Sequence, residues 1–230
     1  SKVGSSLTVR GWVRSFRSNR FIALSDGSTL QTLQGVVDFE QMDENLLKRV
    51  AVGTALELSG DLVTSQGKGQ SVELQVSDLK ILGDSPADQY PLQPKKHSLE
   101  FLRENAHLRV RTNTFGAVFR IRHQLAFAVH QYFHQRGFFY QNTPVLTASD
   151  AEGAGEMFRV SALDMQNPPR NEEGHIDYRQ DFFGQEANLT VSGQLEAELM
   201  AMGLGKVYTF GPTFRAENSN TARHLAEFWM

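Results

Sequence analysis

Short runs of alternating apolar and polar residues fill about the first eighty positions and limit that part of the chain to β-structure. In the first run, Leu7, Val9 and Val13 fall on one face of an extended strand, because successive side chains point to opposite faces. The other runs are 21–25, 30–37, 54–59 and 71–81, with a short helix expected at 44–50. Five short strands with a helix after the third predict an all-β OB-fold barrel, which we assign to residues 1–83.

The next segment changes character and leads into a different fold class. Residues 83–94 contain three prolines among Gly, Asp and Ser, so we expect 84–108 to form a linker or hinge. Residues 114–136 repeat apolar side chains at helical spacing and end at Gly137, which predicts a long helix. Strands are expected at 138–141, 157–161, 188–191, 206–216 and 224–230, with a helix at 193–202. This mixture predicts an α+β domain over residues 109–230.

Composition excludes several classes of function. The absence of cysteine rules out disulfides, thiolate metal sites and a cysteine nucleophile. No apolar run is long enough to cross a bilayer, and the N-terminus has no signal-peptide pattern. His130 and His134 on the long helix mix with core positions, so we expect no protein metal site in this segment. A formal charge of −3 gives no global attraction to nucleic acid, so RNA binding depends on local patches such as the arginine-rich stretch 10–20.

The strongest chemical pattern lies in residues 207–230. A strand through 207–217 places Arg215 and Glu217 on one face. After a polar turn, a second strand returns with His224 and Phe228 together on one face. The hairpin therefore predicts a single cavity lined by these four side chains, with Arg223 at its edge. Because a guanidinium binds phosphate bidentately and an aromatic ring stacks on a base, the cavity suits a nucleotide.

The amino-acid sequence of this hairpin resembles that of a known family. Residues 214–228, FRAENSNTARHLAEF, resemble motif 2 of the class II aminoacyl-tRNA synthetases, in the form typical of the asparaginyl branch of the aspartyl/asparaginyl subgroup. Residues 137–146, GFFYQNTPVL, resemble motif 1, which implies a homodimer with Pro144 at its interface. The resemblance covers nearly the whole chain. It implies an anticodon-binding barrel followed by a class II catalytic domain with an antiparallel sheet and helices.

The resemblance also implies a reaction, the ATP-dependent activation of L-asparagine and its transfer to tRNA(Asn) in the cytoplasm. Arg215 would be the catalytic residue and would hold the α-phosphate through both steps. Arg223 and His224 would contact the γ-phosphate end, Phe228 would stack on adenine, and Glu217 would contact the adenine edge. Mg²⁺ would bridge the phosphates.

Substrate choice is implied by residues 190–198, TVSGQLEAE. Ser192 and Gln194 match positions that contact the α-amino end of the amino acid in this subgroup. Aspartyl enzymes carry a Lys three residues after that Gln, where this chain has Ala197. A pocket without the cation favours a neutral carboxamide, because burying an unpaired carboxylate is costly. Either Glu217 or Asn218 would receive the side-chain amide. The mobile loop that closes over the amino acid would have at its tip Glu152, Gly153 and Ala154.

In the barrel, the resemblance implies an anticodon site. Phe21 would stack on an anticodon base, and Gln34 would read the middle uridine through its amide. Arg14 and Arg17 would hold the phosphate backbone. Faces of OB-folds bind single-stranded nucleic acid by aromatic stacking and local cations. The resemblance implies that the partner is tRNA and not DNA.

Motif 3 of the family, a helix with a second ATP-binding arginine, does not occur in the sequence. We therefore expect a catalytic domain that is incomplete at its C-terminus and a chain that is weakly active or inactive alone. Two alternatives stay open. The first is an aspartyl-tRNA synthetase with relaxed tRNA specificity, against which Ala197 argues. The second is a non-catalytic RNA-binding and dimerising fragment, against which the joint retention of the motif 2 side chains argues.

Overall fold

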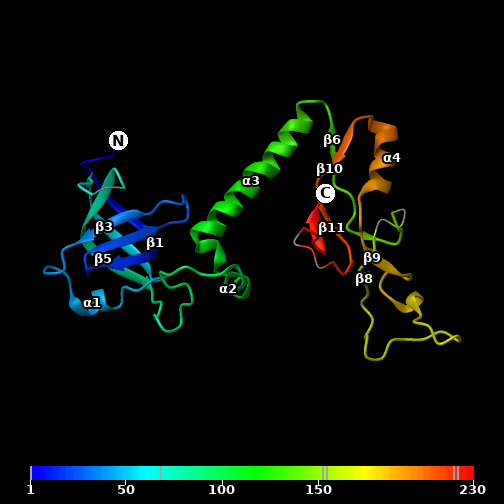
Figure 1. Ribbon diagram of the computed structural model, residues 1–230, viewed down its shortest axis with the longest axis horizontal. Coiled ribbons are helices and arrows are strands. Elements are labelled where there is room, and N and C mark those ends of the chain that lie inside the picture. The colour runs from blue at the N-terminus through cyan, green and yellow to red at the C-terminus, as the bar shows by residue number, and fades with distance from the viewer. Residues whose placement is uncertain (1, 68, 152, 154, 220, 222) are drawn as a thin grey trace. The chain divides into compact units, whose positions relative to one another are not determined.

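The computed structural model describes residues 2–67, 69–151, 153, 155–219, 221 and 223–230 (Figure 1). The chain divides into two compact units, Ser1–Gln124 and Leu125–Met230. The division falls inside the helix α3 (Asn113–His134). No helix among the described residues is long and apolar enough to span a membrane.

The first unit is built on a closed barrel with the strand order β1-β2-β3-β5-β4, drawn in blue to cyan in Figure 1. Neighbouring strands are antiparallel except β3 and β5, which pair in parallel. The predicted OB-fold is therefore confirmed. The barrel elements are β1 (Ser6–Arg17), β2 (Phe21–Ser25), β3 (Leu33–Val37), α1 (Glu44–Lys48), β4 (Ala55–Thr64) and β5 (Val72–Gly83).

The core of this unit is the interior of the barrel. Alternation turns one face of each strand inward, and Val13, Ile22, Leu56 and Leu74 are at most 1% exposed. Leu47 of α1 packs against the same cluster. Burying each such side chain contributes about 1.5–3 kcal/mol, so the barrel interior is the main stabilising element of the unit.

The bounds of β3 and β4 differ from the prediction, each for a local reason. β3 begins at Leu33 and not at residue 30, because residues 29–31 bend, and the Thr29 hydroxyl closes this bend by donating to the Gln31 carbonyl at 3.0 Å. β4 continues to Thr64, because Gly60 accommodates a register shift within the ladder and does not end the strand.

The rest of the first unit is a folded loop and helical turns. The side-chain amide of Gln93 donates to the carbonyl oxygens of Ala87 at 3.1 Å and Tyr90 at 2.7 Å, and Leu92 is buried. These contacts give residues 84–98 a definite path. The elements that follow are α2 (Leu99–Glu104), the 3-10 helix η1 (Arg109–Arg111) and the start of α3 (Asn113–His134).

The second unit mixes short strands and helices, as the α+β prediction requires. Its described strands form an antiparallel three-stranded sheet β7-β9-β8, an antiparallel hairpin β11–β12 and a parallel pair β6–β10. The elements are β6 (Phe139–Gln141), β7 (Leu146–Thr147), β8 (Arg159–Val160), η2 (Tyr178–Gln180), β9 (Ala187–Leu189), α4 (Gln194–Leu204), β10 (Val207–Thr209), β11 (Pro212–Phe214) and β12 (Glu227–Trp229).

The single strand predicted at 206–216 is two strands, and this corrects the prediction. β10 pairs with β6, whereas β11 pairs with β12, so the chain changes partner between them. Gly211 lies at the change, where its backbone exchanges hydrogen bonds with Met230. Tyr208 of β10 is buried, and its hydroxyl lies 2.7 Å from His130 Nδ1. Beside the expected antiparallel strands the unit therefore contains a separate parallel pair, and β7 lies where no strand was predicted.

Candidate active site

The hairpin β11–β12 places the nucleotide-binding candidates. Antiparallel pairing joins Thr213 to Phe228 and continues past the strands, where the Arg215 N–H donates to the Ala226 carbonyl at 2.9 Å. A further hydrogen bond of 2.9 Å, from Phe214 N to the Thr190 carbonyl, ties the hairpin to the end of β9. The predicted ATP-binding side chains thereby line one cavity of about 220 Å³, together with Leu225: Arg215, Glu217, Arg223, His224 and Phe228.

Arg215 is a half-buried cation of this cavity. Its guanidinium carbon lies 5.4 Å from the centroid of the Phe228 ring. Its Nε is buried and has no hydrogen-bond partner among the described residues. An unsatisfied buried donor costs about 1–3 kcal/mol, so the arrangement is suited to an added acceptor such as a phosphate oxygen. The structure therefore brings the predicted side chains together, while their individual roles stay predictions.

The other polar candidate side chains of the hairpin are exposed. Glu217 and Asn218 both face solvent, so exposure does not select between them as the group that receives a side-chain amide. His224 Nδ1 is hydrogen bonded to the Thr221 hydroxyl, and Arg223 is exposed at the loop, as the hairpin pattern predicted.

Sequence reasoning missed Gly155, which lies against the same cavity residues. A Cβ atom at Gly155 would lie 2.8 Å from Glu217 Oε1 and 3.1 Å from Arg215 Cδ. The backbone nearby is fixed to the hairpin, since Ala216 N donates to the Glu156 carbonyl at 2.7 Å. Gly155 therefore allows the loop before β8 to approach the cavity. Its sequence signal, one glycine in a glycine-rich loop, did not distinguish it from its neighbours.

The predicted amino-acid-binding residues lie at the start of α4. The Ser192 hydroxyl accepts a hydrogen bond from Gln194 N at 3.1 Å, and Gln194 Nε2 donates to Glu198 Oε1 at 3.0 Å. Ala197 lies in the first turn of α4, where its N–H donates to the Gly193 carbonyl at 3.1 Å. Helix α4 thus begins at Gln194, with Gly193 as its N-cap directly after Ser192.

Four further predicted positions precede this segment in the sequence. Gly153 is exposed and has a left-handed backbone with φ +64°, which favours glycine. Glu152 and Ala154 lie outside the described residues. Pro144 is exposed between β6 and β7, and its place in a dimer interface stays a prediction.

On the barrel, the anticodon candidates share neighbouring strands. Arg17 of β1 and Phe21 of β2 are register partners. Gln34 of β3 donates a hydrogen bond from its side-chain amide to Glu73 Oε2 at 3.2 Å.

Sequence reasoning missed Glu73, which is only 9% exposed and also accepts hydrogen bonds from Ser65 Oγ and Gln75 Nε2. A strand-borne Glu between apolar neighbours was the available signal. The hydrogen bond to Glu73 uses the amide nitrogen of Gln34. The side-chain carbonyl oxygen of Gln34 has no partner among the described residues.

Arg14 has a different environment from the one expected for a phosphate-binding residue. Its guanidinium donates to the carbonyl of Arg111 and, at 3.0 Å, to Asn113 Oδ1. Burial lowers the pKa of this guanidinium, and the neighbouring Tyr90 partly offsets that effect. Arg14 thus links the barrel to the turn before α3, and its contact with RNA stays a prediction.

The described side chains offer no protein cage for a metal. Among them, no group of three or more His, Asp or Glu residues is placed to hold an ion. An exposed carboxylate, Glu217, does line the cavity beside Arg215. Mg²⁺ commonly takes one or two carboxylates together with substrate phosphates and water, and this donor set fits that kind of binding.

Comparison with known proteins covers both parts of the chain. The family described as class II tRNA synthetases (D, K and N) matches residues 98–230. The family described as an OB-fold nucleic acid binding domain, of the tRNA anticodon type, matches residues 7–82.

Curated relatives and solved structures agree with these matches. Asparagine–tRNA ligase of Cytophaga hutchinsonii is 58% identical over 99% of this chain and 50% of its own length. The ligase of Parabacteroides distasonis is 57% identical over 99% of this chain and 49% of its own length. The structure of Entamoeba histolytica asparaginyl-tRNA synthetase in complex with asparaginyl-adenylate matches with TM-score 0.78 and 26% identity, over 98% of this chain and 48% of that one. The structure of Pyrococcus horikoshii asparaginyl-tRNA synthetase complexed with asparaginyl-adenylate matches with TM-score 0.79 and 24% identity, over 99% of this chain and 49% of that one. At this identity the match shows a common fold. The chain spans about half the length of the curated relatives it matches.

Proposed function

We propose a function for this chain on one established premise, namely that it belongs to the class II tRNA synthetases of the D, K and N group. We infer that its residues serve to activate L-asparagine with ATP and to attach it to tRNA(Asn). Relatives named asparagine–tRNA ligase support this choice of amino acid, as does a related enzyme solved with asparaginyl-adenylate. The proposal concerns the activity to which this half-length chain contributes.

The observation that carries the proposal is the environment of Arg215. Its Nε is buried and unpaired, its guanidinium lies over the Phe228 ring, and both side chains line one cavity. A half-buried cation with a buried, unused N–H donor suits a phosphate oxygen, and the neighbouring ring offers a stacking surface for a base.

In the first step, a carboxylate oxygen of asparagine attacks the α-phosphorus of ATP. The bond from that phosphorus to the bridging oxygen breaks, and pyrophosphate leaves. Arg215 donates to the α-phosphate oxygens, Phe228 stacks on adenine, and Glu217 contacts the adenine edge. Arg223 and His224 contact the γ-phosphate end. No protein nucleophile takes part, so the rate comes from positioning and from stabilised charge.

In the second step, a ribose hydroxyl of the terminal adenosine of tRNA(Asn) attacks the carbonyl carbon of the adenylate. An ester bond forms, AMP leaves, and the hydroxyl proton is released. The barrel supplies specificity at the far end of the tRNA. There Phe21 stacks on an anticodon base, Arg17 and Arg14 contact the backbone, and Gln34, oriented by Glu73, reads the middle uridine through its carbonyl oxygen.

Amino acid choice follows from a missing charge. Ser192 and Gln194 contact the α-amino end of the substrate, and Glu217 or Asn218 receives its side-chain amide, under the loop tip around Gly153. Ala197 supplies no cation for a carboxylate. Aspartate would therefore be buried with an unpaired charge, whereas asparagine is neutral.

The surroundings of the reaction are also part of the proposal. Mg²⁺, when bound, would neutralise charge on the phosphate oxygens, and those oxygens together with water would hold it. We place the protein in the cytoplasm as a homodimer, with Pro144 at the interface. Leu125 and Phe127 on α3 support an interface there, because these apolar side chains are 61% and 56% exposed.

The proposal is tested by calorimetric titration of the chain with a non-hydrolysable asparaginyl-adenylate analogue. We expect Arg215→Ala to weaken binding by about tenfold to 10²-fold, since a hydrogen bond to a charged group contributes about 1.5–3 kcal/mol. Arg103→Ala is the matched control, because Arg103 is exposed on α2 and contacts only Glu100 at 3.4 Å. Circular dichroism checks that both variants fold. Equal affinity of the Arg215 and Arg103 variants would contradict the proposal.

A further inference from the structure

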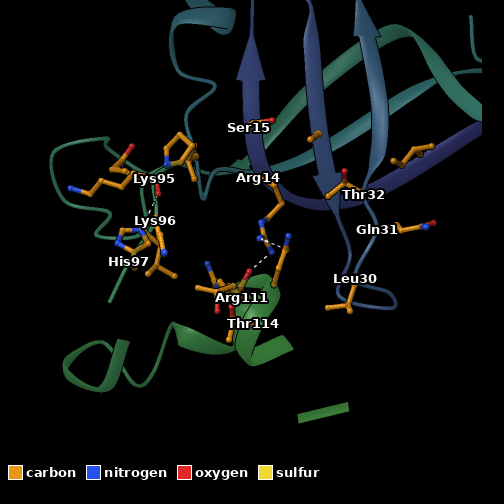
Figure 2. Close-up of a pocket in the computed structure, with 18 of the residues that line it drawn as sticks. Arg14, Ser15, Leu30, Gln31, Thr32, Lys95, Lys96, His97, Arg111 and Thr114 are labelled. Carbon is orange, nitrogen blue, oxygen red and sulfur yellow. Dashed lines mark hydrogen bonds between the residues drawn. The ribbon is translucent and has the colours of Figure 1, made fainter. Parts of the chain in front are cut away.

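A second cavity, of about 980 Å³, lies within the first unit (Figure 2). Its cationic lining consists of Arg14, Lys95, Lys96 and Arg111, and none of the described residues that line it is Asp or Glu. Acidic residues outnumber basic ones in the chain, 26 to 23, so a lining with only positive charge departs from the average surface. Such a cavity attracts an anion.

No described ion pair neutralises these four cations. Figure 2 shows Arg14 extending from the barrel toward Arg111, whose guanidinium carbon lies 5.2 Å from the centroid of the Trp12 ring. Glu73 is the sequence neighbour of the lining residue Val72. Its carboxylate already accepts three side-chain hydrogen bonds within the barrel. The positive charge at the cavity is therefore available to a ligand.

The two lysines are held in place by a hydrogen-bonded loop. Lys95 N donates to the Gln93 carbonyl at 2.7 Å, and the same carbonyl lies 3.0 Å from His97 Nε2. The His97 ring stacks on Phe101 with centroids 4.7 Å apart. In Figure 2, Lys95, Lys96 and His97 lie on one side of Arg14, and Leu30, Gln31 and Thr32 lie on the other. Little backbone ordering is needed before a ligand binds, which favours affinity.

The cavity adjoins the barrel face that carries the anticodon candidates. Its lining includes Ser15 and Ala23, which are register partners on β1 and β2. Two positions along the same strands lie Arg17 and Phe21, also register partners and, by alternation, on the same face. Ala23 is in turn the register partner of Gln34 on β3. A strand of RNA held at Phe21 and Gln34 therefore passes beside the cavity.

We propose that this cavity binds consecutive phosphate groups of the RNA strand held on the barrel face, with Lys95, Lys96 and Arg111 as the contacting cations. Arg14 fixes the position of Arg111 from the barrel side. The inference rests on the proposed function, since it takes tRNA as the partner. It adds residues outside the barrel to the RNA-binding surface.

The test compares variants of the chain by fluorescence anisotropy with a labelled anticodon stem-loop of tRNA(Asn) at several salt concentrations. Lys95→Ser with Lys96→Ser removes two exposed cations of the cavity. Lys2→Ser with Lys80→Ser removes the same charge from exposed positions that do not line it. We expect the cavity variant to bind on the order of tenfold more weakly, with a salt slope smaller by about 1.4, since each single-strand phosphate contact contributes about 0.7. The control variant should keep the wild-type slope.

A third variant, Phe21→Ala, separates this inference from the proposed function. If Phe21→Ala weakens binding while the lysine variants bind alike, the cavity assignment is overturned and the anticodon face stands. If none of the variants weakens binding, both the cavity assignment and the proposed recognition of RNA by the barrel are overturned. Titration with inorganic tripolyphosphate tests whether the cavity binds a free anion instead of RNA. Tripolyphosphate binding that needs Lys95 and Lys96, with RNA binding unchanged, would assign the cavity to a free polyphosphate and overturn the RNA contact.

Discussion

At the scale of single residues, Asp177 illustrates how neighbouring donors set the charge state of a half-buried carboxylate. Its oxygens accept hydrogen bonds from Arg179 Nε at 2.7 Å and from Gln180 Nε2 at 3.2 Å. These contacts, with Arg179 the largest cause, lower the pKa of Asp177 from 3.8 to about 2. The carboxylate also caps η2 by accepting from Arg179 N.

This shift predicts a pH dependence of the η2 turn. Because the folded pKa lies below the unfolded one, the carboxylate stabilises the turn above about pH 4, and this contribution is lost as pH falls toward 2. An NMR titration should give an Asp177 midpoint near 2, and Arg179→Ala should raise it toward 3.8. Arg170→Ala, which removes a cation bound to the Gly174 carbonyl, should leave the midpoint in place. An Asp177 midpoint that does not respond to Arg179→Ala would contradict the assignment.

Which site residues could be predicted from the sequence depends on how local their signal is. Arg215 and Phe228 could be placed on a common cavity because strand alternation and one turn determine their faces. Glu73 and Gly155 could not be found in this way. Their importance comes from contacts with Gln34 and Glu217, which are distant in sequence and meet only through strand pairing and loop packing.

At the scale of elements, Gly60 determines how β4 passes its neighbour β5. The register shifts between Ser59 and Gly60, and a Cβ atom at Gly60 would lie 1.9 Å from the Gln75 carbonyl oxygen. Real Cβ atoms do not approach backbone oxygen so closely, so a side chain there must displace one of the two strands.

Gly60→Ala should therefore destabilise the barrel by about 1–3 kcal/mol, the usual cost of inserting a methyl group into a packed site. Gly67→Ala is the matched control, since a Cβ there meets only Ser65 Oγ at 3.5 Å. Urea denaturation followed by Trp12 fluorescence, in a Trp229→Phe background, measures the free energy of unfolding of the barrel. The same midpoint for both glycine variants would refute the packing argument.

The barrel strands were predictable because alternation over a half-buried ladder is a strong local signal. The second unit was less so. Its strands are two or three residues long, and such runs carry too little periodicity to locate their ends. The break at Phe210 and Gly211 depends on which strand each half pairs with, β6 or β12, and pairing is a property of the fold.

At the scale of the whole molecule, a barrel of the OB-fold nucleic acid binding family and a domain of the class II tRNA synthetase family occur in one chain. The domain boundaries expected from the sequence, at 83 and 108, stay a proposal, as does the low activity expected of the chain alone. The family assignment could be made from the sequence because motif 2 is a long and specific string. Dimerisation and subcellular location involve groups beyond the described chain, and both stay proposals.

The central claim is that these residues serve the activation of asparagine, and amino-acid-dependent exchange of pyrophosphate into ATP tests it most directly. The assay uses a protein of the relatives' length that carries this chain, with L-asparagine and L-aspartate compared at equal concentration. The account predicts exchange with asparagine and at least tenfold less with aspartate, because Ala197 leaves an aspartate carboxylate unpaired, and a penalty of about 1.4 kcal/mol already corresponds to tenfold. Equal exchange with both amino acids, or exchange with aspartate alone, would contradict it.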